Sequence, residues 1–162
     1  MSKSTKIIVR AGLIAGLYVV LSLITFPIAS GFIQFRLSEA LTLLPLFFLE
    51  AAPALFVGCA FSNLITGCTV LDVLFGSLTT LLAGVITLLV GKTIKKTFAK
   101  IVIGGLAPVI LNASLLPVIW IWAYGQIELM YTVQMLVLLI SQAISVYGAG
   151  TPLALMLKKY NK

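Results

Sequence analysis

Arg36 and Glu39 stand three residues apart at the start of an apolar segment. The 162-residue chain contains only 4 acidic residues, so each carboxylate is informative. A charge near the hydrocarbon of a membrane is costly, by about 2.5–3.5 kcal/mol at the centre of a helix, and it is usually kept because it serves a function. The pair could serve structure, transport or catalysis, and the segments around it have to decide among these.

Other polar side chains interrupt apolar stretches further along the chain. Asp72 begins one stretch, Asn63 lies near the end of another, and Asn112 lies in the middle of a third. Hydrogen bonds between helices would explain such residues, and so would the polar lining of a ligand cavity. Asp72 would also complement a helix dipole, and Glu39 could cap a helix. A last group shares one stretch: Gln134, Ser141, Gln142 and Ser145.

The composition is that of a polytopic membrane protein. Hydrophobic residues make up 61% of the chain and charged residues 9%. A soluble domain averages roughly 45–50% apolar and about 25% charged residues. We therefore expect an all-α integral membrane protein of the cell membrane, in which residues 1–162 form a single domain.

The net charge of +7 does not indicate nucleic-acid binding, because no basic stripe meets stacking aromatic residues in a polar segment. Short basic clusters that flank apolar spans are instead topology signals and suit anionic lipid headgroups. The three clusters are Lys3, Lys6 and Arg10; Lys92, Lys95, Lys96 and Lys100; and Lys158, Lys159 and Lys162.

The sequence offers no constellation for catalysis, metal binding or nucleotide binding. Histidine is absent, and Cys59 and Cys68 fit no metal or redox spacing. Gly91 and Lys92 resemble the end of a phosphate-binding loop, but Ile86 stands where that loop requires glycine. We expect no catalytic residue, no metal and no cofactor, so any energy input must come from a partner or a gradient.

Six helices are expected to cross the membrane, each needing about 20 mostly apolar residues. Residues 37–67 could form one helix or two, and Ala52 before Pro53 is biased away from helix. Two helices place all three basic clusters on the cytoplasmic side, with both termini, as the positive-inside rule requires. The first span is expected to end at Pro27 and the fourth at Gly91. The predicted spans are 7–26, 37–50, 53–67, 71–90, 102–123 and 131–157, the last long enough to tilt or bend near Gly148, Gly150 and Pro152.

The second span is short. Its 14 residues would cover about 21 Å as an α-helix, against a hydrocarbon core of roughly 30 Å. The preceding loop, residues 29–35, should therefore fold over the outer face and cover an external ligand cavity. Arg36, Glu39, Asp72 and Glu128 would gather at that outer mouth, where an entering ligand meets them first.

Small residues recur near the cytoplasmic end of the first span. Ala11 and Ala15 interleave with Gly12 and Gly16, and this spacing flattens a helix face. The face could pack inside the bundle or dock a separate membrane subunit, and spacing alone does not separate the two.

Aromatic residues end the fifth span. Trp120, Trp122 and Tyr124 fit an interfacial belt, and one of them could stack on a flat heterocycle.

Two segments resemble a known family. Residues 33–45 (IQFRLSEALTLLP) and 71–78 (LDVLFGSL) resemble signature segments of the queuosine-precursor transporter (QueT) family. The resemblance implies a substrate-binding S component of an energy-coupling factor (ECF) transporter, a type of ABC importer. Such a protein captures a 7-deazaguanine, such as queuine or preQ1, from outside for ATP-driven uptake. The implied partners are a transmembrane coupling subunit and two cytoplasmic ATPases, and Ala11 and Ala15 match the face that docks the coupling subunit in similar S components.

The resemblance also implies roles for the polar residues. A carboxylate, Glu39 or Asp72, would accept paired hydrogen bonds from the donor edge of the base. Asn112 or Gln142 would serve the carbonyl and ring edge. Arg36 would hold the carboxylate or bind the carbonyl oxygen, and Asn63 is a further candidate.

Two other functions compete with this interpretation. One is an S component for another flat vitamin or for tryptophan. The other is a solitary gradient-driven carrier, but the sequence has no inverted repeat and no acid at the membrane centre for a proton relay. A small membrane enzyme would need a nucleophile or clustered metal ligands, which the sequence lacks.

Overall fold

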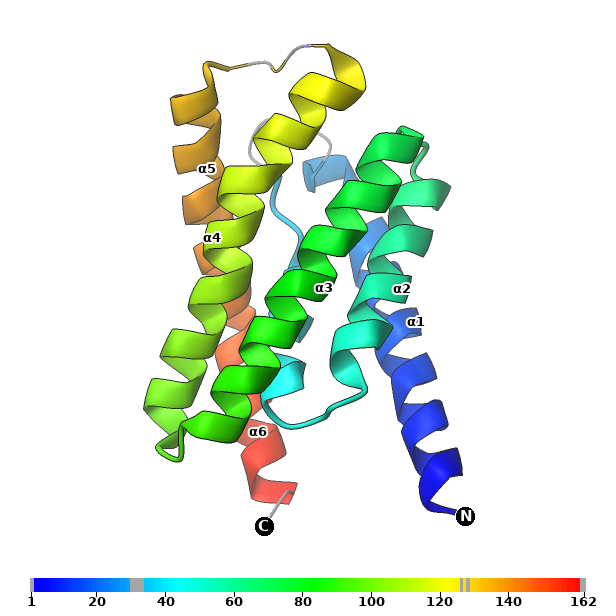
Figure 1. Ribbon diagram of the computed structural model, residues 1–162, viewed down its shortest axis with the longest axis vertical. Helices are drawn as coiled ribbons and strands as arrows, with labels where there is room; N and C mark the ends of the chain where they lie inside the picture. The colour runs from blue at the N-terminus through cyan, green and yellow to red at the C-terminus, as the bar shows by residue number, and fades with distance from the viewer. Residues whose placement is uncertain (1, 30–33, 126, 128, 161–162) are drawn as a thin grey trace.

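The computed structural model describes residues 2–29, 34–125, 127 and 129–160, and these residues fold into helices without a strand (Figure 1). A 3₁₀-helix, η1, lies between the first two α-helices, and a π-helix, η2, joins α5 to α6 without a break. The elements are α1 (Lys3–Ala29), η1 (Leu37–Leu46), α2 (Ala51–Ile65), α3 (Val70–Thr93), α4 (Thr97–Tyr124), α5 (Tyr131–Ala143), η2 (Ile144–Ala149) and α6 (Gly150–Tyr160).

Among the described residues, four helical stretches are long and apolar enough to cross a membrane. They are α1, α3, α4 and the continuous stretch from Tyr131 to Lys158, whereas η1 and α2 are shorter apolar helices. The all-α class is confirmed. Gly148, near which the last span was expected to tilt or bend, lies within the π-helix. The six-span count and the cytoplasmic termini stay predictions. Most of the expected covering loop, residues 30–33, and Glu128 lie outside the described residues.

The short second segment differs in type from the expected α-helix over residues 37–50. It is a 3₁₀-helix that ends at Leu46. A 3₁₀-helix rises about 2.0 Å per residue, against about 1.5 Å in an α-helix. Its 10 residues therefore extend about 20 Å, close to the length expected of a longer α-helix.

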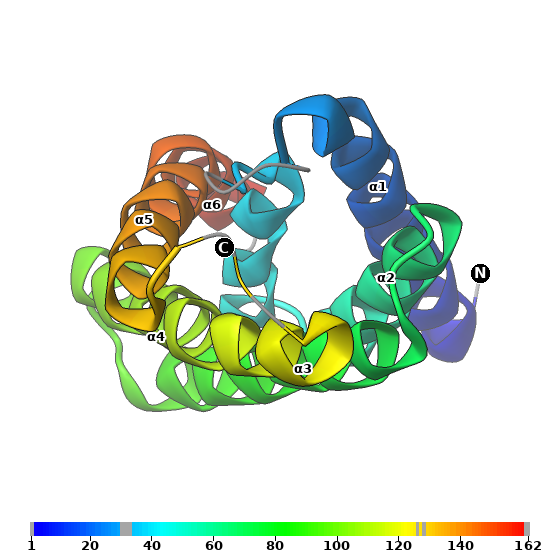
Figure 2. The same cartoon turned by 90° about the horizontal axis from the view of Figure 1, so that it is seen from above.

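This 3₁₀-helix lies inside the ring formed by the other helices (Figure 2). Every residue from Ser38 to Leu46 is buried, and η1 contacts α1, α2, α3, α4, η2 and α6. Glycines allow this close approach. A Cβ atom on Gly91 would lie 2.8 Å from the carbonyl oxygen of Leu46, and one on Gly150 would lie 2.8 Å from that of Ala40.

Three helices extend beyond the limits of the expected membrane spans. The first helix continues through Pro27 to Ala29, so the break comes after the proline. Ala51 already begins α2, because Pro53 falls in the first turn, where a backbone N–H would have no helical partner anyway. Gly91 does not end α3, which runs on to Thr93, because this glycine serves the contact with η1.

Pro108 lies inside α4 and removes one backbone hydrogen bond from that helix. The carbonyl of Gly104, four residues earlier, loses its usual donor. The hydroxyl of Thr87 on α3 donates to this carbonyl at 2.9 Å, and Thr87 is fully buried. The proline is therefore tolerated because a neighbouring helix supplies the missing donor.

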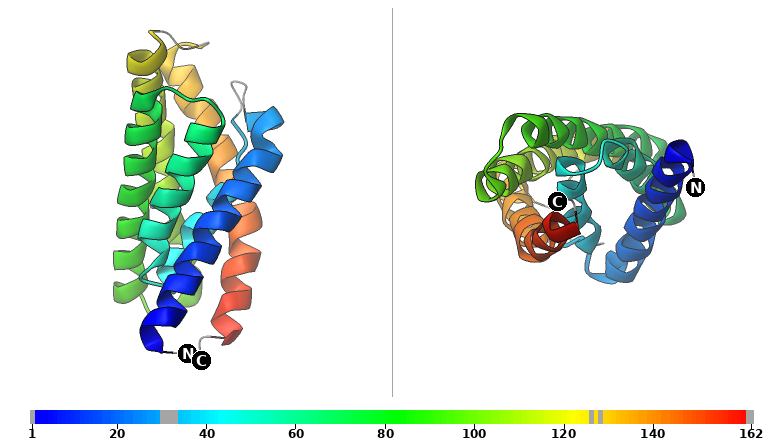
Figure 3. Two further views of the ribbon diagram at one scale, coloured as in Figure 1. Left: turned by 90° about the vertical axis from the view of Figure 1, so that its right-hand side faces the viewer. Right: turned by 90° about the horizontal axis from the view of Figure 1, so that it is seen from below.

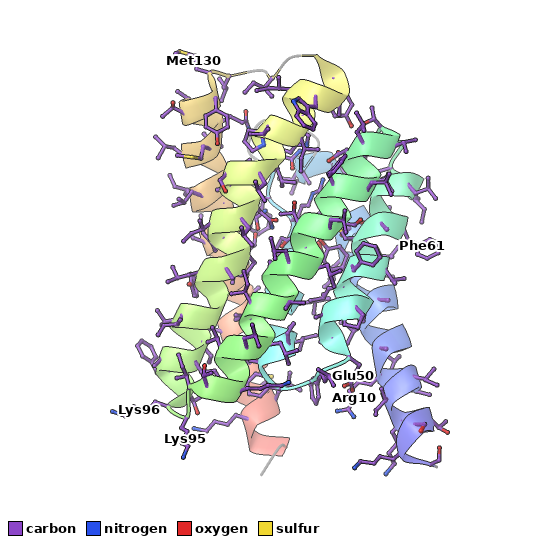
Figure 4. All side chains as sticks on the ribbon, in the orientation of Figure 1. Arg10, Glu50, Phe61, Lys95, Lys96 and Met130 are labelled. Carbon is purple, nitrogen blue, oxygen red and sulfur yellow. The ribbon has the colours of Figure 1, made fainter. Side chains whose placement is uncertain are left out.

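The start of α1 and the end of α6 lie at the same end of the bundle (Figure 3). Lys95 and Lys96 lie at that end too, and Met130 lies at the opposite one (Figure 4). Arg10 and Glu50 also meet there, with 2.8 Å between Nε and Oε1. This arrangement of the basic residues agrees with the positive-inside expectation.

The substitution Gly91→Ala tests the close packing around η1. We expect it to lower the free energy of unfolding by about 1–3 kcal/mol, because the new methyl group overlaps the backbone of Leu46. Thermal denaturation of the purified protein in detergent, followed by tryptophan fluorescence, measures the loss. Gly12→Ala is the matched control, since nothing lies within 4 Å of its Cβ position. Equal melting temperatures for both variants would contradict the packing argument.

Candidate ligand-binding site

Glu39 lies in the first turn of η1 and is 3% exposed. Both carboxylate oxygens have donors from other helices. The hydroxyl of Tyr18 on α1 donates to Oε1 at 2.8 Å, and the amide of Asn112 on α4 donates to Oε2 at 3.0 Å. Buried charges persist where such hydrogen bonds compensate for lost water. The Glu39 side chain therefore does not cap its own helix; it is bound to two other helices.

The amide of Asn112 extends this network to the last long helix. Its Nδ2 also donates to Oε1 of Gln142, at 3.3 Å. Because Oε1 accepts this bond, the NH₂ group of Gln142 remains as the donor end of that side chain. Gln142 lies two residues before the π-helix, and such π segments occur frequently at functional sites.

Arg36 and Asn63 form the second polar pair. The guanidinium of Arg36 donates to Oδ1 of Asn63 at 3.3 Å, and Nδ2 of Asn63 lies 3.8 Å from the sulfur of Cys59. Within the described residues the one ion pair with an N–O distance under 4.0 Å joins Arg10 to Glu50. In the described residues Arg36 therefore makes no direct ion pair with Glu39, whose carboxylate accepts hydrogen bonds from Tyr18 and Asn112. Its expected role at the site stays a prediction.

Asp72 supplies a second buried carboxylate, with the side chain 4% exposed. Its backbone N–H donates to the hydroxyl of Thr69, which caps α3, so the favourable position beside the helix dipole holds. The hydroxyl of Tyr124 on α4 lies 3.4 Å from Oδ2 of Asp72. A Cβ atom on Gly76 would lie 3.2 Å from Oδ1 of Asp72 and 3.3 Å from Nδ2 of Asn63, so this glycine lets both side chains come close.

A single cavity is lined by all of these predicted site residues. The structure brings together Arg36, Glu39, Asn63, Asp72, Asn112 and Gln142, from η1 and its preceding residue, α2, α3, α4 and α5. Their role in binding stays a prediction. No group of three or more metal-ligating side chains occurs among the described residues.

Five further residues line the cavity: Cys59, Gly76, Thr80, Leu116 and Trp120. Of these, the sequence had pointed only to Trp120, as one of three aromatic residues that could stack on a ligand. Each lies on the same helix face as a predicted residue, because four residues make about one helical turn. Asp72, Gly76 and Thr80 follow this spacing on α3, and Asn112, Leu116 and Trp120 follow it on α4. The sequence thus carried a signal for them, once the face was known.

The cavity is narrow as the side chains stand. Its volume is about 10 Å³, room for the centre of about one water molecule. A fused bicyclic base is many times larger, so a ligand of that kind would have to displace lining side chains. The side chains that form hydrogen bonds with one another in the site could form them with a ligand instead.

The aromatic residues at the end of α4 separate into two environments. Trp120 is the one of the three that lines the cavity. Trp122 is 71% exposed and meets Phe75 edge-on, with 6.5 Å between ring centroids. Tyr124 is not a lining residue, but its hydroxyl contacts Asp72, which is one.

The remaining polar residues of the last helix do not line the cavity. Gln134, Ser141 and Ser145 are buried, as their shared spacing predicted. The hydroxyls of Ser141 and Ser145 donate to carbonyls of their own helix, of Leu138 and Ser141, so they make no bond between helices there.

The small residues of α1 divide between two faces. Ala11 and Ala15 are partly buried and pack against a core cluster that includes Leu55 of α2. A Cβ atom on Gly58 of α2 would lie 2.9 Å from the carbonyl oxygen of Ala15, so internal packing is part of their role. Gly12 and Gly16 are exposed. Docking of another subunit on this helix stays a prediction.

The bundle of apolar helices, with polar side chains gathered at one cavity, defines a multi-pass membrane protein. Comparison with known families confirms and sharpens that class. The chain belongs to the QueT transporter family, whose pattern it matches over residues 8–159, nearly its whole length. It is accordingly a membrane transporter of a queuosine precursor. No curated protein and no solved structure matches the chain.

The two tryptophans allow a direct test of where a ligand enters. In Trp122→Phe, Trp120 is the only tryptophan, and a queuosine precursor that enters the cavity should change its fluorescence in a saturable way. In Trp120→Phe, the exposed Trp122 should show no such change. A saturable change from Trp122 alone would contradict the assignment of this cavity.

Proposed function

We propose that this protein is the substrate-capture subunit, or S component, of an ECF-type ABC importer. It binds a 7-deazaguanine such as queuine or preQ1 from outside and releases it for ATP-driven uptake. The observation that carries the proposal is the Glu39 carboxylate, which is buried at one wall of the cavity and held by two donors. Membership of the QueT transporter family supports the same substrate class.

The donor edge of the base suits Glu39. A 7-deazaguanine presents a ring N–H and an amino group side by side, and a carboxylate can accept both in parallel, charge-assisted bonds. A carboxylate offers about four lone-pair sites, and Tyr18 and Asn112 together use two of them. Enough acceptor capacity remains for the two donors of the base.

The other walls complement the rest of the base. The carbonyl oxygen needs a donor, which the guanidinium of Arg36 or the NH₂ group of Gln142 supplies. The indole of Trp120 offers a flat apolar face for the rings. A second carboxylate, Asp72, lines the same cavity and would attract an amino group carried by the ligand.

Binding requires the cavity to widen. Two hydrogen bonds join side chains that line it: Asn112 donates to Gln142, and Arg36 donates to Asn63. A base that offers both donors and acceptors can replace these bonds without leaving a buried polar group unpaired. A purely apolar ligand of the same size could not, because the separated partners would each lose a hydrogen bond.

Binding of preQ1 and queuine to the purified protein, measured by isothermal titration calorimetry, tests the capture step. Hydrogen bonds to a charged group contribute about 1.5–3 kcal/mol, so Glu39→Gln should weaken binding by at least about tenfold. We expect Asp72→Asn also to weaken the binding of preQ1, because preQ1 carries an aminomethyl cation. Glu50→Gln is the matched control, because Glu50 pairs with Arg10 at the opposite end of the bundle and does not line the cavity. Unchanged binding in Glu39→Gln would refute the site assignment.

Energy coupling would come from partner subunits. The sequence has no nucleotide-binding motif, so ATP hydrolysis would belong to two cytoplasmic ATPases, joined to this protein by a transmembrane coupling subunit. The proposed docking face is the cytoplasmic half of α1, around Ala11 and Ala15. A solitary gradient-driven carrier is the rival, and it would need no such partners.

Affinity purification from native membranes distinguishes these two mechanisms. We expect a coupling subunit and an ATPase pair to co-purify with the tagged wild-type protein. Ala11→Leu should reduce that recovery several-fold while ligand binding in detergent is retained, because a bulky side chain prevents close helix approach. Ile28→Leu, at the exposed opposite end of α1, is the control. Purification of the wild-type protein without any ATPase, together with uptake driven by a gradient alone, would favour the carrier.

A further inference from the structure

Tyr18 occupies an unusual place for a tyrosine in a membrane helix. It lies in the middle of α1, and its side chain is 0% exposed. Its hydroxyl makes the shortest of the bonds to the Glu39 carboxylate, at 2.8 Å. Yet Tyr18 is not among the residues that line the cavity, whereas Glu39 is. The hydroxyl therefore reaches the carboxylate from the wall behind it.

Other polar side chains of α1 also contact η1 or residues close to it in the sequence. Ser22, one turn further along, donates to the hydroxyl of Ser38 at 2.8 Å, next to Glu39. Arg10 pairs with Glu50 just beyond the other end of η1. The helix packs mainly against α2 and η1, so these polar contacts fix α1 relative to the 3₁₀-helix. Of the three, only the contact from Tyr18 touches a predicted ligand-binding group.

We propose that Tyr18 is a positioning residue for ligand binding, which acts through Glu39 and does not contact the ligand. This inference rests on the proposed function. The hydroxyl holds Oε1 from behind while Asn112 holds Oε2, so the carboxylate presents its remaining lone pairs in one fixed orientation. A bidentate contact with two parallel donors depends on that orientation, because both bonds must align together.

The energetics favour this role over simple filling of space. Inside a low-dielectric bundle, a hydrogen bond to a carboxylate is stronger than in water. If the hydroxyl were removed, Oε1 would lose a donor, and the carboxylate would be free to rotate toward Asn112. The ligand would then have to order a side chain that the wild-type protein already holds in place, which weakens binding.

The substitution Tyr18→Phe tests the inference because it keeps the buried ring and removes only the O–H group. We expect the dissociation constant for preQ1 or queuine to rise by about 10- to 100-fold, with the ring packing retained. Ser22→Ala is the matched control, since it removes the neighbouring bond between α1 and η1 without touching Glu39. It should change the dissociation constant by less than about threefold. The apparent melting temperature of each variant reports whether folding is intact.

A double-mutant cycle distinguishes positioning from a general loss of structure. If Tyr18 acts through Glu39, Tyr18→Phe should have almost no further effect on binding in a Glu39→Gln background. If the wild-type protein binds the ligand and Tyr18→Phe binds it equally tightly, the inference is overturned and the proposed function stays intact. Equal losses in Tyr18→Phe and Ser22→Ala, or additive losses in the cycle, would overturn it as well. A wild-type protein that binds no 7-deazaguanine would instead overturn the proposed function and this inference together.

Discussion

The structure depends on a carboxylate buried within an apolar bundle. Glu39 is only 3% exposed, so the chain has to supply hydrogen-bond donors from other helices. They come from α1 and α4, two helices far apart in sequence, and each bond fixes the position of its helix relative to η1. The same side chain that would recognise a ligand is therefore also a point where the fold is joined together.

The 3₁₀-helix that carries Glu39 sets the second constraint. It is surrounded by other elements, so its backbone has to pack directly against theirs. Gly91 and Gly150 permit that contact, and a side chain at either position would overlap η1. A neighbouring helix also supplies a donor to α4, where the hydroxyl of Thr87 replaces the hydrogen bond that Pro108 removes. Irregular backbone inside a membrane is tolerable only when neighbouring protein provides such partners.

The cavity couples stability to recognition. Its polar side chains satisfy one another as they stand, through the bonds of Asn112 with Gln142 and of Arg36 with Asn63. A ligand gains affinity only to the extent that it replaces those bonds, because a separated buried pair is penalised. Specificity would then follow from matching donors and acceptors one for one, and apolar molecules of similar size would be rejected. The support given to Glu39 from behind, by Tyr18, lowers the cost of ordering the site.

The sequence by itself determined the helical class, the apolar segments and the candidate site residues. It could do so because hydrophobicity and the rarity of charge are local properties. It placed Arg36, Glu39, Asn63, Asp72, Asn112 and Gln142 among the site candidates, and the fold brings all six to one cavity. Only the tertiary structure decided which side chains form hydrogen bonds with one another. Tyr18, which the sequence did not single out, donates to Glu39, and η1 is a 3₁₀-helix where an α-helix was expected. The physical reason is that hydrogen-bond partners and close backbone contacts depend on how helices distant in sequence meet, and a linear pattern of residues does not encode that meeting.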